Sequence, residues 1–445
     1  GSKPMRPGRK HWMIWTAAFG LATCLSRPDT SKVLPGTAFL TEEGDWARQM
    51  VEGMHQHLDR LLNGARQRRD AVWAQEDAGS ENGSGSLLSV ADANRSNLCQ
   101  MLGVVDPRSP VAVRYHAPVK AAHTTGAPPV EVARGPNYRV FAVSWAVLRN
   151  VEGEGLLLEP DSEPKANLIA VPDCEWTPEQ AVGLAPGVPT ENQFPRRFAE
   201  VGCRVLVPAL IDRGTRFSGH PGVRQVQHSQ RETLWRASYE LGRTPTGYEV
   251  QKLIAAANWF EAIETADTAA RRSRGPTPAQ SEHVPSVRLG IIGYGEGGWE
   301  ALLAGALDKR FQAVAVCGAF GLCTRLPEQP IDRNLWTLLP RFGDAELAAM
   351  VLPRKLCLEF GAYPEIVLTD EHGGAPGRLW RPAREEFDAE IVRLKQWRSS
   401  LETFVHHAAP DSVCDRVTAM EVLKTLNPTV VMAEQLGSPP AWRDR

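Results

Sequence analysis

Short apolar runs dominate the chain from residue 138 onward, and longer stretches with helical spacing separate most of them. Tyr138–Leu148 alternates between apolar and polar positions and is followed by Gly153–Glu159, which predicts an antiparallel pair of strands. Six later runs are short and almost continuously apolar: Asn167–Pro172, Arg204–Pro208, Val287–Ile292, Ala313–Cys317, Lys355–Phe360 and Glu402–His406. Such runs are typical of parallel strands that are buried on both faces of a sheet. The pattern therefore predicts an α/β protein with a mostly parallel, eight-stranded sheet flanked by helices.

The segment before this sheet has helical periodicity instead. Between Glu42 and Gln75, six residues recur on one helical face: Trp46, Met50, Met54, His57, Leu61 and Leu62. A low-complexity insert at residues 76–86 precedes a shorter helix, expected from about Val90 to Leu102. We expect residues 40–105 to form an N-terminal helical region that packs on a main domain, residues 106–430. An amphipathic helix from about Ser412 to Leu426 ends that domain, and a Pro-rich tail follows at 431–445.

The N-terminal residues have the pattern of a secretory signal. Arg6, Arg9 and Lys10 precede a short apolar run at residues 12–25 that ends in small residues. This run is too short to span a bilayer comfortably, and no other segment could cross a membrane. We therefore expect residues 1–25 to be a signal peptide and the protein to be exported. A lipid anchor at Cys24 is an alternative, although Thr23 fits the lipoprotein pattern poorly.

Composition excludes several classes of function. The chain has 445 residues, of which 42% are hydrophobic, which is ample for a large core. A net charge of −2 provides no basic field for nucleic acid. The eight cysteines form no C-x-x-C pair and show no ligand spacing with histidine, so we expect neither a zinc site nor a dense disulfide framework. No cofactor is indicated.

The most informative stretch is Val287-Arg-Leu-Gly-Ile-Ile-Gly-Tyr-Gly-Glu-Gly-Gly-Trp-Glu-Ala-Leu-Leu. Its apolar start predicts a strand, its glycines a sharp turn, and the residues from Trp299 onward a helix. This is the layout of a nucleophile elbow, Gly-x-Ser-x-Gly, in which the central side chain stands above a parallel sheet. In the frame Gly293-Tyr-Gly-Glu-Gly297, however, the central residue is Gly295. Glycine has no side chain that could form an acyl-enzyme.

Together these features resemble the α/β-hydrolase superfamily, in particular dienelactone hydrolases and acetyl xylan esterases. Three segments carry the resemblance: residues 204–219 before the expected lid helices, the elbow helix at 293–308, and residues 344–360, a helix followed by a strand. The resemblance covers roughly residues 140–430. It implies an α/β-hydrolase fold and, for a family member with its serine intact, hydrolysis of a carboxylic or carbohydrate ester.

The resemblance also implies positions for a catalytic site. Gly295 occupies the nucleophile position and leaves it vacant, Glu365 is the carboxylate nearest the acid position, and His406 or His407 best matches the base. Backbone N–H groups of Glu296 and of the loop at 173–175, including Cys174, could form an oxyanion hole. The residues expected to line a pocket for a small ester or carbohydrate are Tyr294, Trp176, Asp212 and His220.

Two features have both a structural and a functional interpretation. Glu296 could act as a base or nucleophile in place of the missing serine, but a carboxylate at the start of a helix is stabilised there without any catalytic role. Charged residues are also dense between Asp212 and Glu249. A solvated, ion-paired helical face is the default interpretation of these residues, and a pocket for a polar ligand is the alternative.

Three functions remain open at this point. The first is a degenerate hydrolase-fold protein without its nucleophile, which acts through binding or structure. The second is an active ester hydrolase with an atypical catalytic group. The third is a dinucleotide-binding oxidoreductase, because Gly293, Gly295 and Gly298 also satisfy the G-x-G-x-x-G pattern. That pattern requires an acidic residue at the end of the next strand, where this chain has Cys317-Gly-Ala.

Overall fold

The computed structural model describes residues 35–37, 44–78, 86–116, 129–218, 228–273, 287–370, 374–397 and 403–443. The expected signal peptide with Cys24, most of the 76–86 insert, and His220 lie outside the described residues. The chain divides into two compact units, Gly1–Asp59 and Arg60–Arg445. The larger unit therefore holds the sheet and part of the helical region that precedes it. No helix among the described residues is long and apolar enough to cross a membrane.

The sheet contains all eight expected strands. They are β3 (Tyr138–Leu148), β4 (Val151–Pro160), β5 (Asn167–Val171), β6 (Arg204–Pro208), β7 (Leu289–Tyr294), β8 (Phe311–Cys317), β9 (Lys355–Phe360) and β12 (Thr403–His407). Their spatial order is β3-β4-β6-β5-β7-β8-β9-β12, antiparallel from β3 to β6 and parallel from β6 to β12. This order and these directions are those of the α/β-hydrolase fold, as the sequence predicts.

The expected count of eight strands is too low, because the sheet has 11 strands within the described residues. The three additional strands, β1 (Val113–His116), β2 (Ala133–Arg134) and β13 (Ala441–Trp442), lie at the antiparallel end. Each has four residues or fewer, and β1 and β13 are mostly exposed, so none of the three leaves a hydrophobic pattern in the sequence. A separate hairpin pairs β10 (Ile366–Leu368) with β11 (Gly377–Leu379).

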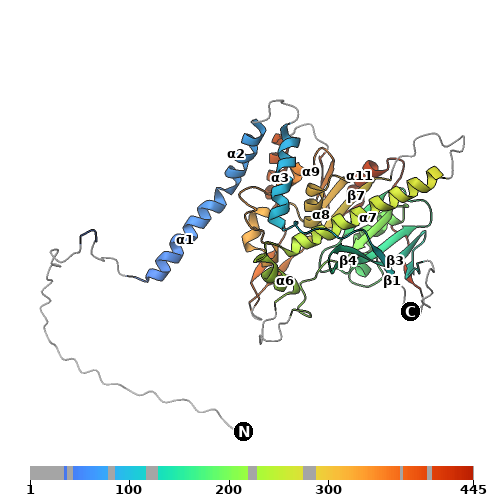
Figure 1. Cartoon of the computed structure of the whole chain (residues 1–445), viewed down its shortest axis with the longest axis horizontal. Helices are drawn as coiled ribbons and strands as arrows, with labels where there is room; N and C mark the ends of the chain where they lie inside the picture. Colours follow the sequence, from blue (N-terminus) through green and yellow to red (C-terminus); the bar gives the residue numbers. More distant parts are fainter. Residues whose placement is uncertain are drawn as a thin grey trace, which may run out of the picture. The chain divides into compact units, whose positions relative to one another are not determined.

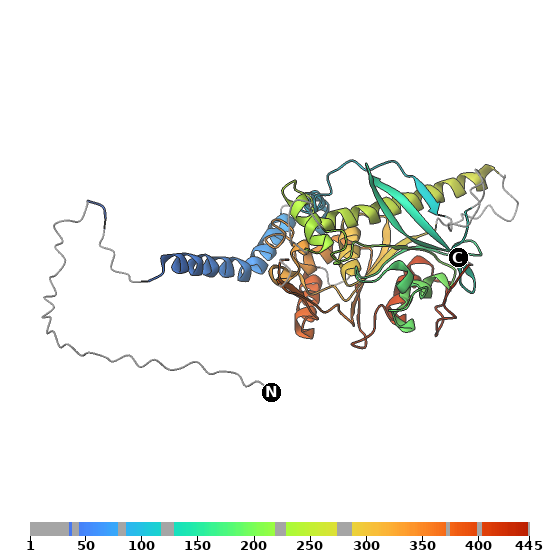
Figure 2. The same ribbon diagram turned by 90° about the horizontal axis from the view of Figure 1, so that it is seen from below.

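Helices cover both faces of the sheet and bury two cores. The described α-helices are α1 (Trp46–Asn63), α2 (Ala65–Ala78), α3 (Ser86–Leu102), α4 (Pro178–Ala181), α5 (Phe194–Ala199), α6 (Gln230–Tyr239), α7 (Pro245–Ser273), α8 (Glu296–Leu307), α9 (Asp344–Val351), α10 (Arg384–Trp397) and α11 (Arg416–Leu426). Successive residues of a strand face opposite sides, so Ile169 joins the core under α7 and α8 whereas Leu168 joins the core under α5 and α11. Figures 1 and 2 show α7 running across the sheet, on the face to which Ile169 points.

The N-terminal helical region is one helix longer than expected, since Gly64 separates α1 from α2. Within the larger unit, α3 packs on α8 and α9. Arg95 of α3 donates from Nε to the carbonyl of Ala306 and from Nη2 to the carbonyl of Met350, both at 2.8 Å. The described part of the tail also joins this unit, because Gly437 N donates to Glu200 Oε2 at 2.8 Å and β13 pairs with β2.

Candidate functional site

The turn between β7 and α8 has the backbone of a nucleophile elbow. Gly295, at its apex, has φ 59° and ψ −122°, a conformation that L-residues rarely adopt. Its N–H donates to the carbonyl of Cys317 at 3.0 Å, and its carbonyl accepts from Trp299 N at 3.1 Å. The flanking glycines allow close packing, since a Cβ on Gly293 would lie 2.0 Å from the carbonyl oxygen of Gly297. The elbow is therefore present although it carries no side chain.

The space in front of Gly295 is filled by other parts of the chain. A Cβ at this position would lie 2.2 Å from Oδ2 of Asp173 and 2.6 Å from Cγ of Pro364. Asp173 is buried and accepts two backbone hydrogen bonds, from Glu296 N at 2.8 Å and from Glu175 N at 3.0 Å. The N–H of Glu296, expected to face an oxyanion, is thus bonded to a carboxylate of the protein itself. A carboxylate at the start of α8 also suits the positive end of the helix dipole.

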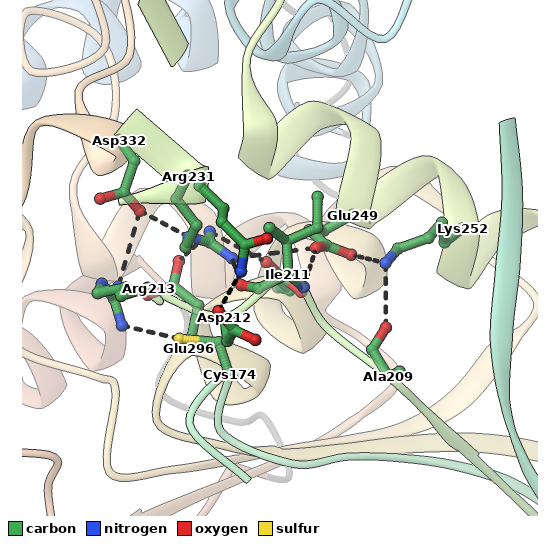
Figure 3. Close-up of polar contacts among 12 residues, drawn as sticks. Cys174, Ala209, Ile211, Asp212, Arg213, Arg231, Glu249, Lys252, Glu296 and Asp332 are labelled. Carbon is green, nitrogen blue, oxygen red and sulfur yellow. Dashed lines mark hydrogen bonds and ion pairs between the residues drawn. The ribbon is translucent and has the colours of Figure 1, made fainter. Parts of the chain in front are cut away.

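The Glu296 side chain lies in a buried cluster of guanidinium groups (Figure 3). Its Oε2 is 2.9 Å from Arg213 Nη2 and 2.5 Å from Arg333 Nη1, and its Oε1 is 3.0 Å from Arg231 Nη2. Burial alone would raise the pKa of Glu296, but the charges of Arg333, Arg231 and Arg213 lower it below its ordinary value. An ionised carboxylate held by three cations is a weak base, so these contacts give Glu296 a structural role.

Arg231 is the centre of this cluster. Its Nε donates to Asp332 Oδ2 at 2.7 Å, and its Nη1 lies 3.9 Å from Glu249. Glu249 also pairs with Lys252, which donates to the carbonyl of Ala209 at 3.0 Å (Figure 3). The expectation of a solvated face is therefore wrong for Arg231 and Glu249, which are fully buried, whereas Arg236 and Glu240 are exposed. Arg213, in the loop after β6, and Arg231, in α6, therefore both bind Glu296 at the start of α8.

Two further titratable side chains, Glu300 and Cys174, contact the buried arginines. Burial raises the pKa of Glu300, with Glu249 adding to the effect, and neither carboxyl oxygen of Glu300 has a hydrogen-bond partner. Cys174 receives a 2.8 Å contact at Sγ from Arg213 Nη1, but burial raises the pKa of its thiol well above the ordinary value. Because thiolate is the reactive form, Cys174 is a poor nucleophile here. Its side chain belongs to the arginine cluster through the contact with Arg213.

The residues expected at the acid and base positions have other partners. Glu365 is exposed and follows Pro364, the residue whose ring faces Gly295. His406 Nε2 lies 2.7 Å from Asp415 Oδ2. His407 lies 3.5 Å from Asp388 and packs edge-on against Phe360 and Phe387. Both histidines therefore pair with carboxylates outside the elbow, His406 with Asp415 and His407 with Asp388. The loop after β12, residues 408–415, contains no histidine.

A cleft of about 830 Å³ lies at the loop after β5, which also carries Asp173. Strands β3 and β4 and the loops after β5 and β6 line it, and it includes three residues predicted from the sequence: Cys174, Trp176 and Asp212. Tyr294 is buried behind Trp176, with ring centroids 5.0 Å apart. Asp212 fixes the wall of the cleft, since its Oδ1 accepts from Gly214 N at 2.7 Å and from Gln230. The cleft thus contains two of the expected pocket residues, Trp176 and Asp212, and none of the elbow residues 293–297 lines it.

The geometry also bears on cofactors. A pyrophosphate would need the space in front of Gly295, which Asp173 and Pro364 occupy, and β8 ends at Cys317 without an acidic residue to hold a ribose. The dinucleotide interpretation therefore lacks both of its required features. Within the described parts of the chain, no group of three or more His, Cys, Asp or Glu residues could hold a metal ion.

Comparisons with solved structures give distant similarities to esterases. A protein assigned as an acetyl xylan esterase from Bacteroides fragilis has 13% identity and a TM-score of 0.48, over 78% of this chain and 84% of that one. A glucuronoyl esterase from Solibacter usitatus has 14% identity and a TM-score of 0.42, over 75% and 91%. Acetyl xylan esterase 1 from Thermoanaerobacterium has 12% identity and a TM-score of 0.38, over 76% and 92%. No protein-family model and no curated protein matches the sequence. The fold assignment rests on the strand order and the elbow described above.

Proposed function

We propose that this protein is an α/β-hydrolase-fold protein that does not hydrolyse esters at its elbow and acts by binding a small ester or carbohydrate in the cleft at the loop after β5. One observation carries the proposal: Asp173 occupies the volume of the missing nucleophile and accepts the hydrogen bond of Glu296 N. Acyl transfer needs an attacking group and free N–H donors for the developing oxyanion. At this elbow the N–H is taken, and a second anion beside Asp173 would be repelled.

The lining of the cleft indicates the chemistry of the ligand. Four carboxylates border it, those of Glu154, Glu175, Glu179 and Asp212, against the single guanidinium of Arg216. An anionic ligand would be disfavoured by this balance, whereas carboxylates accept hydrogen bonds from sugar hydroxyls readily. Trp176 supplies an aromatic surface on the same wall. An uncharged, hydroxyl-rich ligand therefore fits this cleft best.

Three measurements test the proposal. Hydrolysis of p-nitrophenyl acetate should be no faster than with imidazole in water, and a fluorophosphonate probe should leave the protein unlabelled. Isothermal titration calorimetry with xylotriose and its acetylated form should show binding that Trp176→Ala weakens. Trp442, on the edge strand β13, is not among the residues that line the cleft, so Trp442→Ala is the control. Fluorophosphonate labelling, or turnover that saturates with substrate, would overturn the non-catalytic assignment. Unchanged affinity in Trp176→Ala would overturn the ligand site.

The second candidate is an active ester hydrolase with an atypical group, and one observation favours Asp173 over Glu296 as that group. The Asp173 carboxylate lies where a residue-295 side chain would project, whereas Glu296 points into the arginine cluster. In this case Asp173→Asn would abolish turnover while leaving sugar binding intact. Turnover unaffected by Asp173→Asn would exclude this candidate. The burial of Asp173, with 3% of its surface exposed, favours the first proposal.

A further inference from the structure

A second aromatic surface lies away from the cleft, at the other end of α6. The rings of Trp235 and Tyr239 are 4.6 Å apart at 32°, and Tyr239 meets Trp336 at 6.3 Å and 69°. Trp336 is 68% exposed, which is unusual for the largest apolar side chain, and the neighbouring Leu241 is 69% exposed. An exposed group of this kind, bordered by polar residues, marks a binding surface more often than a packing defect.

The surface is held rigidly in place. Trp235 donates from Nε1 to the carbonyl of Asn334 at 3.1 Å, which ties α6 to the segment that carries Trp336. The next residue, Thr337, has φ 57°, a conformation in which a β-branched residue is an outlier. Backbone strain of this kind persists where the surrounding structure enforces it and is concentrated at ligand sites. The backbone therefore keeps the Trp336 ring outside the core.

Polar side chains complete a pocket of about 450 Å³ beside these rings. It is lined by Asn97 and Gln100 of α3, by Glu240 and Arg243 after α6, and by Tyr239 and Trp336. Arg243 forms a two-pronged pair with Asp106, at 2.7 and 3.1 Å, so its charge is already matched. The pocket thus offers an aromatic face, two amides and one carboxylate, without an unmatched cation.

We propose that this pocket is a saccharide subsite that stacks an uncharged pyranose ring on Trp336. One face of a pyranose is a sheet of C–H groups that packs on an indole ring, and its edge carries hydroxyls that donate to and accept from amides and carboxylates. An anion finds no free cation here. A quaternary ammonium would need enclosure by several rings, whereas the Tyr239–Trp336 corner is open on one side.

The subsite is distinct from the cleft at the loop after β5. Gln230 at the start of α6 lines the cleft, and Tyr239 at its end lines the aromatic pocket. At a rise of about 1.5 Å per residue, these two residues lie roughly 14 Å apart along α6. The aromatic pocket would bind a saccharide whether or not the elbow is catalytic, and the inference therefore does not depend on the proposed function.

Calorimetric titration with xylotriose, cellotriose and maltotriose tests the subsite, with choline chloride as the cationic probe. To isolate it, the titrations use Trp176→Ala protein, in which the cleft is impaired. We expect at least one trisaccharide to bind and Trp336→Ala to weaken that binding about tenfold or more. Trp336→Phe should retain part of the affinity, and Trp442→Ala should leave it unchanged.

The results separate the alternatives. Circular dichroism and the unfolding midpoint of Trp336→Ala should match those of the parent protein, because an exposed side chain contributes little to folding. Binding of choline without any trisaccharide would overturn the proposal, as would equal trisaccharide affinity in the Trp336→Ala and parent proteins. A protein that fails to bind saccharide in the cleft, or that proves to be an active esterase, can still bind a trisaccharide at Trp336. The experiments therefore test the subsite and the proposed function separately.

Discussion

The backbone N–H of Glu296 donates a 2.8 Å hydrogen bond to the carboxylate of Asp173. This one contact joins the first residue of α8 to the loop after β5, the two segments that an ester hydrolase of this fold uses to form its oxyanion hole. The same carboxylate lies where a side chain on residue 295 would begin. The contact thus caps the start of α8 with a carboxylate from the loop after β5.

Restoring a serine at the elbow should destabilise the protein without creating an esterase. Gly295→Ser places a Cβ 2.2 Å from Asp173 and forces an L-residue into a conformation with φ 59°. Backbone strain and the lost cap should together lower the free energy of unfolding by about 2–4 kcal/mol, measured by urea denaturation.

Gly242→Ala is the matched control for this substitution, because Gly242 has φ 66° but open space around its Cβ position. It should report the backbone strain alone and cost about 1 kcal/mol. Combining Gly295→Ser with Asp173→Gly should recover part of the lost stability. A fully stable Gly295→Ser protein would show that the elbow has room for a side chain.

Removing the charge of Glu296 should be far more costly than removing a surface charge. In Glu296→Gln, the guanidiniums of Arg213, Arg231 and Arg333 lose their shared buried carboxylate, which should reduce stability by about 3–5 kcal/mol. Glu328→Gln, from an exposed pair with Arg378, should change it by less than about 1 kcal/mol. Similar effects in the two variants would mean that water reaches the arginine cluster.

Glu359 should make stability fall as pH rises toward neutrality. Burial raises the pKa of Glu359 from 4.5 to about 7, although its oxygens accept from Cys414 N at 2.6 Å and Asp415 N at 3.0 Å. The folded state then binds this proton more tightly than the unfolded state does. Its stabilising contribution is therefore complete below pH 4.5 and is lost as pH rises through about 7.

Urea denaturation at pH 4.5, 5.5, 6.5 and 7.5 measures this decline. Glu359→Gln should flatten it, because the amide does not titrate and can still accept one of the two backbone hydrogen bonds. Asp344, whose pKa burial raises to about 6, should account for a remaining slope at lower pH. An unaltered profile in Glu359→Gln would assign the decline to other groups.

Arg95 should hold α3 on the hydrolase fold. Arg95→Ala removes two 2.8 Å hydrogen bonds to the carbonyls of Ala306 and Met350, which should cost about 2–3 kcal/mol. Hydrogen exchange should then speed up in residues 86–102 before it does in β7 or β8. Arg354→Ala offers a comparison, since Arg354 also donates to Met350 but lies outside α3. Unchanged protection of residues 86–102 would show that apolar packing alone holds the helix.

The central strands were predictable because burial on both faces leaves an unbroken apolar run, as in Arg204–Pro208. The two-residue strand Ala133–Arg134 leaves no such pattern and is specified only by its neighbours. The vacant elbow was equally visible, since its glycines lie next to each other in the sequence. Asp173 was not predictable as its occupant, because it is 122 residues before Gly295 and only the fold brings the two together.

The arginine cluster shows the same limit. Charged residues between Asp212 and Glu249 suggest a solvated face, but Arg231 pairs with Glu296 and Asp332 from other segments, and Glu249 pairs with Arg231 and Lys252, so both can be buried. A sequence shows the charges on one segment and not the complementary charges that arrive from another. The local feature that could have indicated a buried cluster is the number of arginines in a segment that also contains the aromatic residues Trp235 and Tyr239.

The pairing of β13 with β2 has a consequence for solubility. Strands at the border of a sheet offer unpaired backbone groups to which another chain can add, and the usual protections are shortness, charge and proline. Here Pro439 and Pro440 come directly before a two-residue strand, which leaves almost no template for such growth. A protein shortened before residue 437 would lose β13 and its two prolines, and the edge would then depend for protection on the shortness of β2 and the charge of Arg134.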